Sequence, residues 1–391
     1  MTRQITVEER RARLATRHRL LPGCRVDDVP AIADDLVALH SSDPATVHLS
    51  AMARMAHPAV GAVEDALYEQ RSLVRHHAMR RTLWVGTPDV VRSMHAAATR
   101  RLAGPEHRRT AKLLEAGGVA DPDRWLADAR SHVATALHEH GPMTARMLGG
   151  LVPELRQPLQ LSPGKKYAAT VSAHTRVLLL LGFEGVVVRT RPSGSWINSQ
   201  YTWAAMDQWL PGGLDGPTER DAARDLADRW LRSFGPGTAA DLRWWAGWTV
   251  GTTRRALADC GAVPVDLDGA EGWVASGDEE PTPPVGPWVA LLPGLDPTTM
   301  GWKERAWYLE PAAEAAFDRN GNAGPTIWAD GRVVGAWAQL PDGEIRTHLF
   351  EDVGGQHRKA IAARADELRA MIGEVRFTVR FPGRIHGTLV G

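Results

Sequence analysis

The stretch LVRHHAMRRTLW, residues 73–84, is the most informative part of this chain. Its two ends, Leu73-Val74 and Thr82-Leu83-Trp84, consist of residues that favour β-strands, so the stretch predicts a β-hairpin. The residues between these ends include three arginines and two histidines, which suit contact with a polyanion or with a base that has left its stack. An ordinary basic hairpin in solvent is the alternative that composition leaves open.

Length and composition set the class of protein. A chain of 391 residues predicts about two to four domains rather than one core. With 43% hydrophobic and 24% charged residues it has the composition of a globular protein, and its longest apolar run, residues 177–183, is too short to span a membrane. The first residues contain no apolar signal segment, and the only cysteines, Cys24 and Cys260, cannot form a disulfide framework. We therefore expect a cytoplasmic protein.

Basic residues gather near the N-terminus although the chain as a whole has no net charge. Residues 1–110 contain 17 arginines, no lysine and 12 acidic residues, a balance of +5, so the remainder carries −5. Eight of the 15 histidines also lie in this first part. A basic N-terminal part on an acidic remainder indicates a protein that binds phosphate backbones.

The helix and strand signals predict an α+β protein in four blocks. Residues 1–115 have the pattern of a winged helix, in which helices are followed by the basic hairpin. The expected helices are Thr6–Leu21, Val29–His40, one that begins at Asp43-Pro44, and Pro58–Tyr68. Aspartate followed by proline is a good helix start, because the carboxylate caps the helix and proline fits its first turn.

Residues 116–212 and 213–278 repeat this plan. In the second block a helix over Lys165–Leu181 is expected to precede a hairpin with strands at Gly185–Thr190 and Trp196–Asn198. Two Gly-Pro-x-Thr turns, at residues 141–144 and 235–238, each stand between an amphipathic helix and a short one. Their recurrence indicates an internal repeat.

The fourth block, residues 285–391, follows a proline-rich linker at residues 279–284. Short strand patterns predominate there, with one helix expected over His357–Ile372 and a last strand over Val375–Phe381. This block predicts a small, mostly antiparallel β-domain that carries one helix.

Three segments of the chain resemble a known family. The hairpin of residues 73–84 is similar to the LVR…MRGTLH hairpin of the winged-helix DNA-binding family that contains the AlkZ and YcaQ DNA glycosylases. Leu291–Asp296 with Gly301–Arg305 resembles the family's LLPGFD…G…R segment, and Asp330–Trp337 resembles its DGRVVGTW strand pair. The resemblance covers nearly the whole chain in the same order. It implies three tandem winged-helix motifs followed by a small β-barrel-like C-terminal domain.

The resemblance also implies an activity. Known members are monofunctional DNA glycosylases that hydrolyse the N-glycosidic bond of bulky or cationic N-alkylated purines, in some cases as self-resistance to DNA-alkylating natural products. The family's catalytic Gln-x-Gln or Gln-x-Asp motif falls on His40-Ser41-Ser42, with Asp43 next. Neither glutamine is present here. We therefore expect His40, Ser42 and Asp43 to be the catalytic residues.

These residue types suit the reaction. An N7-alkylated guanine is already cationic, so the protein needs only to stabilise the sugar cation and to position or deprotonate a water. A histidine with a pKa near 6.5 can accept the water's proton, and a carboxylate can orient that imidazole. Structural roles remain open as well. His40 continues the apolar stripe of the second helix, Asp43 is a good N-cap, and Ser42 is a linker or cap residue.

A second set of residues is expected to contact double-stranded DNA, with plain surface charge as the alternative. These residues are Arg75, His77, Arg80 and Arg81 on the first hairpin, Lys165, Lys166 and Arg176 on a recognition helix, and Arg189, Arg191 and Trp196 on a second wing.

No cofactor or metal is expected. The chain has no phosphate-binding loop or dinucleotide motif, and His76-His77 has no partner at zinc spacing. Two other functions remain open, a non-catalytic winged-helix DNA-binding protein or transcriptional regulator, and a protein that sequesters an alkylating natural product. In each case we expect a monomer associated with the nucleoid, because internal repetition already supplies a concave surface.

Overall fold

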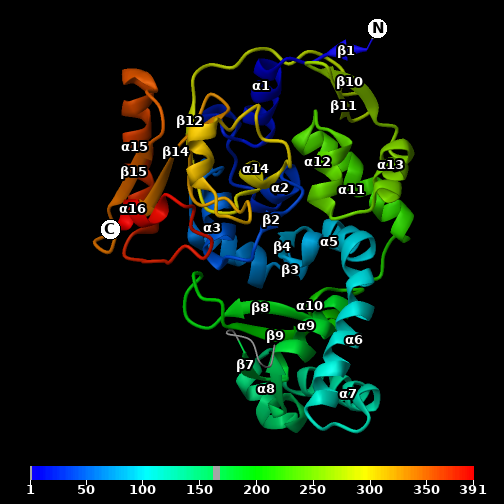
Figure 1. The fold of residues 1–391 in the computed structure, drawn as a ribbon. Helices are drawn as coiled ribbons and strands as arrows, with labels where there is room; N and C mark the ends of the chain where they lie inside the picture. The colour runs from blue at the N-terminus through cyan, green and yellow to red at the C-terminus, as the bar shows by residue number, and fades with distance from the viewer. Residues whose placement is uncertain (1, 162–167) are drawn as a thin grey trace.

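The computed structural model describes residues 2–161 and 168–391, which fold into helices and several small sheets (Figure 1). We call residues 1–115 the first unit, 116–212 the second unit, 213–278 the third unit and 285–391 the C-terminal unit. In Figure 1 the second unit lies below the other three, and the long helix α6 (Arg100–Ala116) leads into it.

The first unit begins with capped helices and ends in a sheet. Thr6, Asp28 and Asp43 each accept a backbone N–H at the start of a helix, so the predicted helix starts at Thr6 and Asp43 are confirmed. The sheet has the strand order β2-β4-β3. The elements are α1 (Val7–Arg17), α2 (Val29–Asp35), β2 (Leu39–His40), α3 (Pro44–Met52), α4 (Val60–Glu64), β3 (Val74–His77), β4 (Leu83–Gly86) and α5 (Pro88–Met94).

The second unit has a similar sheet in the order β5-β9-β8 and a separate two-stranded sheet of β6 and β7. Its elements are α7 (Pro122–His140), β5 (Met143–Thr144), α8 (Ala145–Leu151), β6 (Pro158–Leu161), β7 (Ala169–Ser172), α9 (His174–Glu184), β8 (Val187–Pro192), β9 (Tyr201–Ala205) and α10 (Met206–Trp209).

The sheet of the third unit includes a strand from the N-terminus, β1, which pairs in parallel with β10. Its elements are β1 (Arg3–Gln4), α11 (Glu219–Phe234), α12 (Ala239–Ala246), α13 (Val250–Asp259), β10 (Val263–Leu267) and β11 (Ala270–Val274).

One connectivity recurs in the three units. A short extended segment precedes a helix and pairs with the second strand of the hairpin that follows later. The pairs are β2 with β4, β5 with β9, and Gly237 with Trp273 of β11. The residues at the two Gly-Pro-x-Thr turns provide two of these segments, which is why the same turn sequence occurs before α8 and α12.

The C-terminal unit is an open antiparallel sheet in the order β12-β13-β14-β15, so its described residues form no closed barrel. Helix α15 packs against β12 and β15. The segment Val375–Phe381, predicted as a strand, has no regular secondary structure, and its backbone bonds to the side chains of Gln339 and Asp43. The elements are β12 (Val289–Leu292), α14 (Pro297–Met300), β13 (Thr326–Ala329), β14 (Arg332–Gln339), β15 (Ile345–Leu349), α15 (Gly354–Ile372) and α16 (His386–Val390).

The second helix is shorter than the sequence pattern predicts. α2 ends at Asp35 instead of His40, because Val37 adopts a left-handed conformation (φ 61°) that a helix cannot continue. The chain then extends and pairs with β4. His40 therefore lies on an edge strand, at the entrance to α3.

Two predictions about the second unit are also wrong. The helix expected over Lys165–Leu181 begins only at His174, because Ala169–Ser172 has β-branched residues at its centre and pairs with β6. The strand expected over Trp196–Asn198 is part of a loop. The Asn198 side chain closes this loop through hydrogen bonds to the loop's own backbone.

The hydrophobic core is continuous across the first, third and C-terminal units. The second unit has a separate core, formed chiefly by α7, α8, α9 and the inner face of its sheet. Trp196 and Trp209 of the second unit pack on the large core instead. The second unit is thus attached through part of its surface, whereas the other three are fused.

A buried ion pair joins the first unit to the C-terminal unit. The side chains of Arg54 and Asp296 are 0% exposed, and the guanidinium donates two hydrogen bonds to the carboxylate, at 2.8 and 2.9 Å. Burial opposes ionisation of Asp296, but Arg54 and the Ser50 hydroxyl outweigh it and lower the pKa of this carboxyl. Arg54 also donates to the Thr298 hydroxyl and to the backbone oxygen of His18.

The same region contains a second link between these units. The Thr46 hydroxyl on α3 donates to the backbone oxygen of Gly294 at 2.6 Å. Gly294 and Asp296 both belong to the LLPGLD segment, residues 291–296. That segment therefore holds α3 in place.

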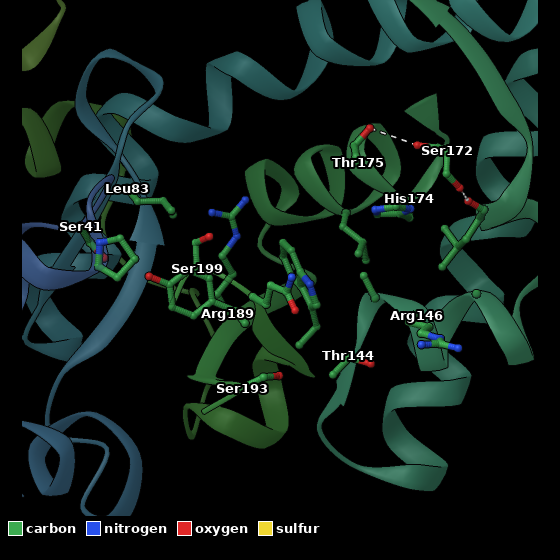
Figure 2. A pocket seen from close by; sticks show the side chains of 18 of the residues that line it. Ser41, Leu83, Thr144, Arg146, Ser172, His174, Thr175, Arg189, Ser193 and Ser199 are labelled. Carbon is green, nitrogen blue, oxygen red and sulfur yellow. Dashed lines mark hydrogen bonds between the residues drawn. The ribbon is translucent and has the colours of Figure 1, made fainter. Parts of the chain in front are cut away.

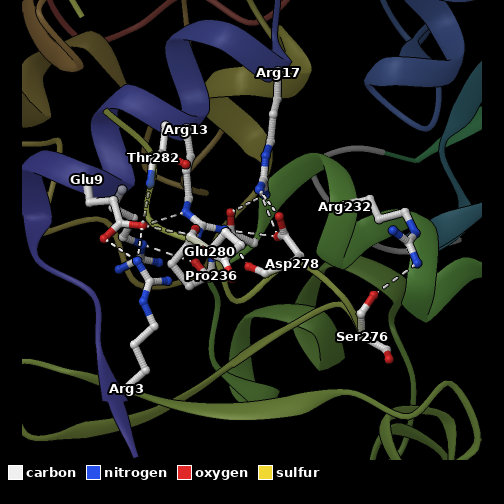
Figure 3. A network of polar contacts seen from close by, with 12 residues as sticks. Arg3, Glu9, Arg13, Arg17, Arg232, Pro236, Ser276, Asp278, Glu280 and Thr282 are labelled. Atoms are coloured by element: carbon white, nitrogen blue, oxygen red, sulfur yellow. Dashed lines mark hydrogen bonds and ion pairs between the residues drawn. The ribbon is translucent and has the colours of Figure 1, made fainter. Parts of the chain in front are cut away.

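Arginines of the N-terminal region attach α1 to the chain that leaves the third unit (Figure 3). Arg3 and Arg13 both donate to Glu9, and Arg13 and Arg17 both donate to Asp278. Much of the positive charge counted in residues 1–110 is thus paired inside the fold.

Replacing Asp296 with asparagine should strongly destabilise the protein. Arg54 would then be a buried charge without a counterion, a change that typically costs about 3–5 kcal/mol. Urea denaturation at pH 7.5 measures this loss in the free energy of unfolding. The control is Asp259→Asn, which removes an ion pair with the exposed Arg220 and should change stability little. Equal losses in the free energy of unfolding in the two variants would contradict the stabilising role of the buried Arg54–Asp296 pair.

The protein should lose stability as the pH falls from 7.5 to 5.5. Burial lowers the pKa of His18, His40 and His48 to about 3 and that of His95 to about 4. In the unfolded chain these groups bind protons below about pH 6.5, so protonation favours unfolding as the pH falls through that value. Thermal unfolding at constant ionic strength measures the effect, and most carboxylates stay ionised in this interval. An unchanged melting temperature would show that these histidines are not buried as described.

Candidate active site

A cleft of about 1110 Å³ lies between the first and second units (Figure 2). The first unit supplies Ser41, Ser42, Pro44 and Leu83, from the entrance of α3 and the neighbouring strand β4. The second unit supplies α8, the first turn of α9 and the β8–β9 hairpin, and the C-terminal unit supplies Arg380. The cleft is therefore assembled from three units.

The cleft is positively charged. Four arginines and one histidine line it, and none of its described lining residues is aspartate or glutamate. The cationic lining residues are Arg146, Arg156, Arg189 and Arg380, whereas burial lowers the pKa of His174 and favours its neutral form. Because acidic and basic residues are equally numerous in the whole chain, this segregation indicates an anionic ligand.

A small cavity of about 40 Å³ shares the lining residue Ser42 with the cleft. Its polar lining comes from His40, Ser42, Arg80, Thr82 and Asn322, and its apolar lining includes Trp84, Trp245, Leu295, Met300 and Phe381. This volume holds a few water molecules but no purine. Ser42 lines both spaces, so the cleft and the small cavity meet at this residue.

His40 is a neutral imidazole at the small cavity. It is 5% exposed, its ring lies 4.7 Å from the Trp84 ring, and burial, with a smaller effect of Arg80, lowers its pKa to about 3. The backbone N–H of Ser42 donates to Nδ1 at 3.3 Å, so the neutral ring carries its proton on Nε2. The expectation of a histidine base with a pKa near 6.5 is thus wrong, because burial makes the imidazole a very weak base.

The Asp43 carboxylate links the start of α3 to the chain at Arg380. Its Oδ1 accepts the N–H of Ala45 at the start of α3, and its Oδ2 accepts the N–H of Arg380 at 3.0 Å. Burial raises the pKa of this carboxyl, while the two backbone donors partly offset that effect. Asp43 lines neither the cleft nor the small cavity. Its carboxylate holds Arg380 at the cleft wall.

Arg75 does not lie on an exposed wing as predicted. It is 3% exposed and donates to the Ser41 hydroxyl, to the Tyr68 hydroxyl and to the backbone oxygen of Thr190. The hairpin of the second unit packs against β3 and covers it. Arg75 therefore joins the two units.

His77 and Trp196 are also buried, contrary to the prediction that they contact DNA. His77 is 6% exposed, with its ring 5.0 Å from that of Phe183. Trp196 is 5% exposed, and its ring lies 5.1 Å from that of His48. Both side chains pack where the first and second units meet.

Arg80 and Arg81 form the exposed turn of the first hairpin, and both have left-handed φ angles, 55° and 64°. Such angles are unfavourable for arginine, and they direct the two side chains to different partners. The Arg80 guanidinium lies over the Trp244 ring, 4.1 Å from its centroid, at the small cavity. Arg81 forms an ion pair of 2.6 Å with the buried Glu106.

The remaining predicted DNA contacts are divided. Arg176 pairs with Glu106, and Arg191 pairs with Glu64 and Glu69. Arg189 lines the cleft, which neither Arg176 nor Arg191 does. Lys165 and Lys166 lie outside the described residues.

Sequence reasoning did not identify several cleft residues, among them Arg146, Arg156, His174, Tyr201 and Arg380. Arg146 had a signal, because it follows the Gly-Pro-x-Thr turn that marks the repeat. Arg380 had none, since its place depends on a hydrogen bond to a residue 337 positions earlier.

A cationic cleft of this kind fits a polyanion such as DNA, and comparison with known proteins assigns the chain to the DNA glycosylases. The family model "DNA glycosylase AlkZ-like" matches residues 33–371. The chain belongs to the AlkZ-like DNA glycosylase family.

Its structure is similar to a solved structure of the DNA glycosylase AlkZ from Streptomyces sahachiroi, with a TM-score of 0.72. The sequences are 22% identical, and the match covers 97% of this chain and 99% of that one. At this identity the likeness shows a shared fold. The chain matches no curated protein.

Two further observations concern the described part of the chain. None of its helices is long and apolar enough to cross a membrane. Nor does it contain a group of three or more histidine, cysteine, aspartate or glutamate side chains placed to hold a metal ion.

Proposed function

We propose that this protein hydrolyses the N-glycosidic bond of bulky or cationic N-alkylated purines in double-stranded DNA. The observation that carries the proposal is the meeting, at Ser42, of the arginine-lined cleft with the small cavity beside His40. We further infer that the three units with the recurring connectivity are winged-helix motifs and that the DNA lies in the cleft between the first and second of them.

Charge supports DNA as the ligand. The guanidinium groups of Arg146, Arg156, Arg189 and Arg380 can neutralise backbone phosphates, and no described carboxylate in the cleft competes with them. Arg80 lies on the exposed turn nearby and retains its proposed contact with DNA. Arg81, Arg176 and Arg191 have carboxylate partners, so their contribution requires the exchange of an ion pair for a phosphate.

The chemistry of the small cavity favours a substrate base that is already cationic. None of its described lining residues is a carboxylate, and His40 is too weak a base to remove a proton from water at neutral pH. A cationic N7- or N3-alkylated purine leaves as a neutral base while its charge passes to the sugar. Such a base needs no acid from the protein.

Under this proposal His40 and Ser42 position the attacking water. The Nε2–H of His40 donates to the water oxygen, and the Ser42 hydroxyl accepts one of its hydrogens at the border of the cleft. The bond between the sugar C1′ and the base breaks with its electron pair on the base, the water oxygen bonds to C1′, and the water's proton leaves to solvent through the cleft. His40 would thus do what the catalytic glutamine does in the family that the sequence resembles. Asp43 acts through the backbone of Arg380 and is a positioning residue.

We extend the proposal to the setting of the enzyme. Self-resistance to a DNA-alkylating natural product is a role that fits a cleft of this size, and a monomer associated with the nucleoid fits a site that one chain supplies.

The test is release of the modified base. Purified protein incubated with a duplex that contains one N7-alkylguanine should leave an abasic site, which alkali converts to a strand break. The panel includes methyl and bulky adducts, and bulky adducts are expected to react fastest. Absence of strand breaks above buffer with every adduct would overturn the proposal. Binding to one operator sequence would then favour a regulator.

Variants of His40 separate a water-positioning role from a base. His40→Ala should lower the rate of base release on the order of 100-fold, because the water loses its orientation. His40→Gln keeps a side chain that can both donate and accept, so it should retain a rate within about tenfold of the wild type. The rate of single-turnover base release measures both. A glutamine variant as slow as the alanine variant would contradict the positioning role.

The pH profile provides a second readout of the same assignment. With the pKa of His40 at about 3, the wild-type rate should not change between pH 6 and 8.5 through this group. A limb with a midpoint near 6.5 that disappears in His40→Gln would show that His40 acts as a base after all.

A further inference from the structure

Two polar groups in the wall of the cleft have no hydrogen-bond partner among the described residues. They are Nε of Arg189 on β8 and the hydroxyl of Tyr201 on β9, and both atoms are buried. Tyr201 is only 8% exposed. Burying a donor without a partner is unfavourable, so such a pair indicates a missing ligand.

The geometry of the hairpin brings these groups to the cleft. Arg189 pairs with Trp203, whereas Tyr201 pairs with Pro192, and the register shifts between Arg189 and Pro192. An irregularity of this kind redirects side chains at the end of a sheet. Both Arg189 and Tyr201 line the cleft, and Figure 2 shows Arg189 in its middle, beside Ser199.

The guanidinium of Arg189 is held by aromatic rings instead of by carboxylates. It lies 4.9 Å from the centroid of the Trp203 ring and 6.0 Å from that of Tyr201. Among the described residues it has no ion pair, in contrast to Arg176 and Arg191. Burial lowers the pKa of Arg189 to about 10, which leaves the group charged at neutral pH.

The guanidinium of Arg75 also lies near Tyr201. It is 4.5 Å from the centroid of the Tyr201 ring, and its own hydrogen bonds hold it in place. Tyr201 is thus close to two guanidinium groups, and no described carboxylate lines the cleft around it. A cationic base is repelled from this position, and an anion is attracted to it.

We propose that Arg189 and Tyr201 form a subsite for a single backbone phosphate of DNA, with the Arg189 guanidinium and the Tyr201 hydroxyl donating to its non-bridging oxygens. The identity of the anion as a DNA phosphate rests on the proposed function. The subsite differs from the exposed Arg146, Arg156 and Arg380 because it is built and partly desolvated before the ligand arrives. It fixes the register of the duplex relative to Ser42.

The first experiment measures binding of an undamaged duplex by fluorescence anisotropy over a range of KCl concentrations. Arg189→Gln should weaken binding and reduce the slope of log Kd against log [KCl] by about one, the value for one lost phosphate contact. Tyr201→Phe should weaken binding without changing the slope, because it removes a donor but no charge. The control Arg220→Gln changes an exposed arginine on α11 that pairs with Asp259, and it should leave both quantities unchanged.

The second experiment locates the phosphate. The duplexes contain one N7-methylguanine on a 2′-fluoro sugar, which resists loss of the base and so keeps binding separate from base release. Each duplex of the set carries a single neutral methylphosphonate, at a different backbone position. At one position the methylphosphonate should weaken binding by the wild-type protein as much as the Arg189→Gln substitution does. The same methylphosphonate should not weaken binding further in the Arg189→Gln variant. An unchanged salt slope in a folded Arg189→Gln protein, or the absence of such a position, would overturn the subsite.

These outcomes are separate from those that test the glycosylase. Binding is measured without base release. If the protein is inactive but shows the expected salt slope and methylphosphonate position, the subsite is supported and the proposed reaction is ruled out. If the protein is active but Arg189→Gln changes neither the salt slope nor the effect of any methylphosphonate position, the proposed reaction is supported and the subsite is ruled out.

Discussion

The buried pair of Arg54 and Asp296 is the interaction on which the site depends. It joins α3 to the LLPGLD segment, and Thr46 adds a second bond between the same two elements. The entrance of α3 contains His40, Ser42 and Asp43, so the position of the whole site follows from how α3 sits on the C-terminal unit. Removing two charges from water costs free energy, and only the groups that pair with them offset this cost. Small changes at this junction are therefore expected to destabilise the fold.

The two spaces of the candidate site differ in charge. Four arginines line the wide cleft, where a polyanion can contact them, whereas the small cavity next to it has the neutral imidazole of His40, the Ser42 hydroxyl and a single arginine, Arg80, whose guanidinium lies over the Trp244 ring. No described carboxylate lines the cavity, which suits the proposed reaction, in which the substrate supplies its own positive charge. A carboxylate in the cavity would stabilise the sugar cation, but in the cleft it would repel the phosphates. Asp43 avoids both places by binding two backbone N–H groups.

Patterns among neighbouring residues predicted helix starts and hairpins, but they did not predict contacts between units. The cap at Asp43-Pro44 and the first hairpin follow from neighbouring residues, and both predictions are confirmed. The end of α2 was missed because a single left-handed residue, Val37, redirects the chain. Arg75 was expected on the surface because an arginine in a hairpin shows no sign of the second unit that covers it. Arg380 reaches the cleft through a bond that spans most of the chain, which no pattern of neighbours contains.

The separate core of the second unit has an evolutionary consequence. Substitutions there alter one wall of the cleft, while His40 and Ser42 stay on the fused body formed by the other units. The width of the cleft can therefore change in evolution independently of the residues that we propose to position water. Relatives can then differ in the size of ligand that they accept through substitutions in this one unit.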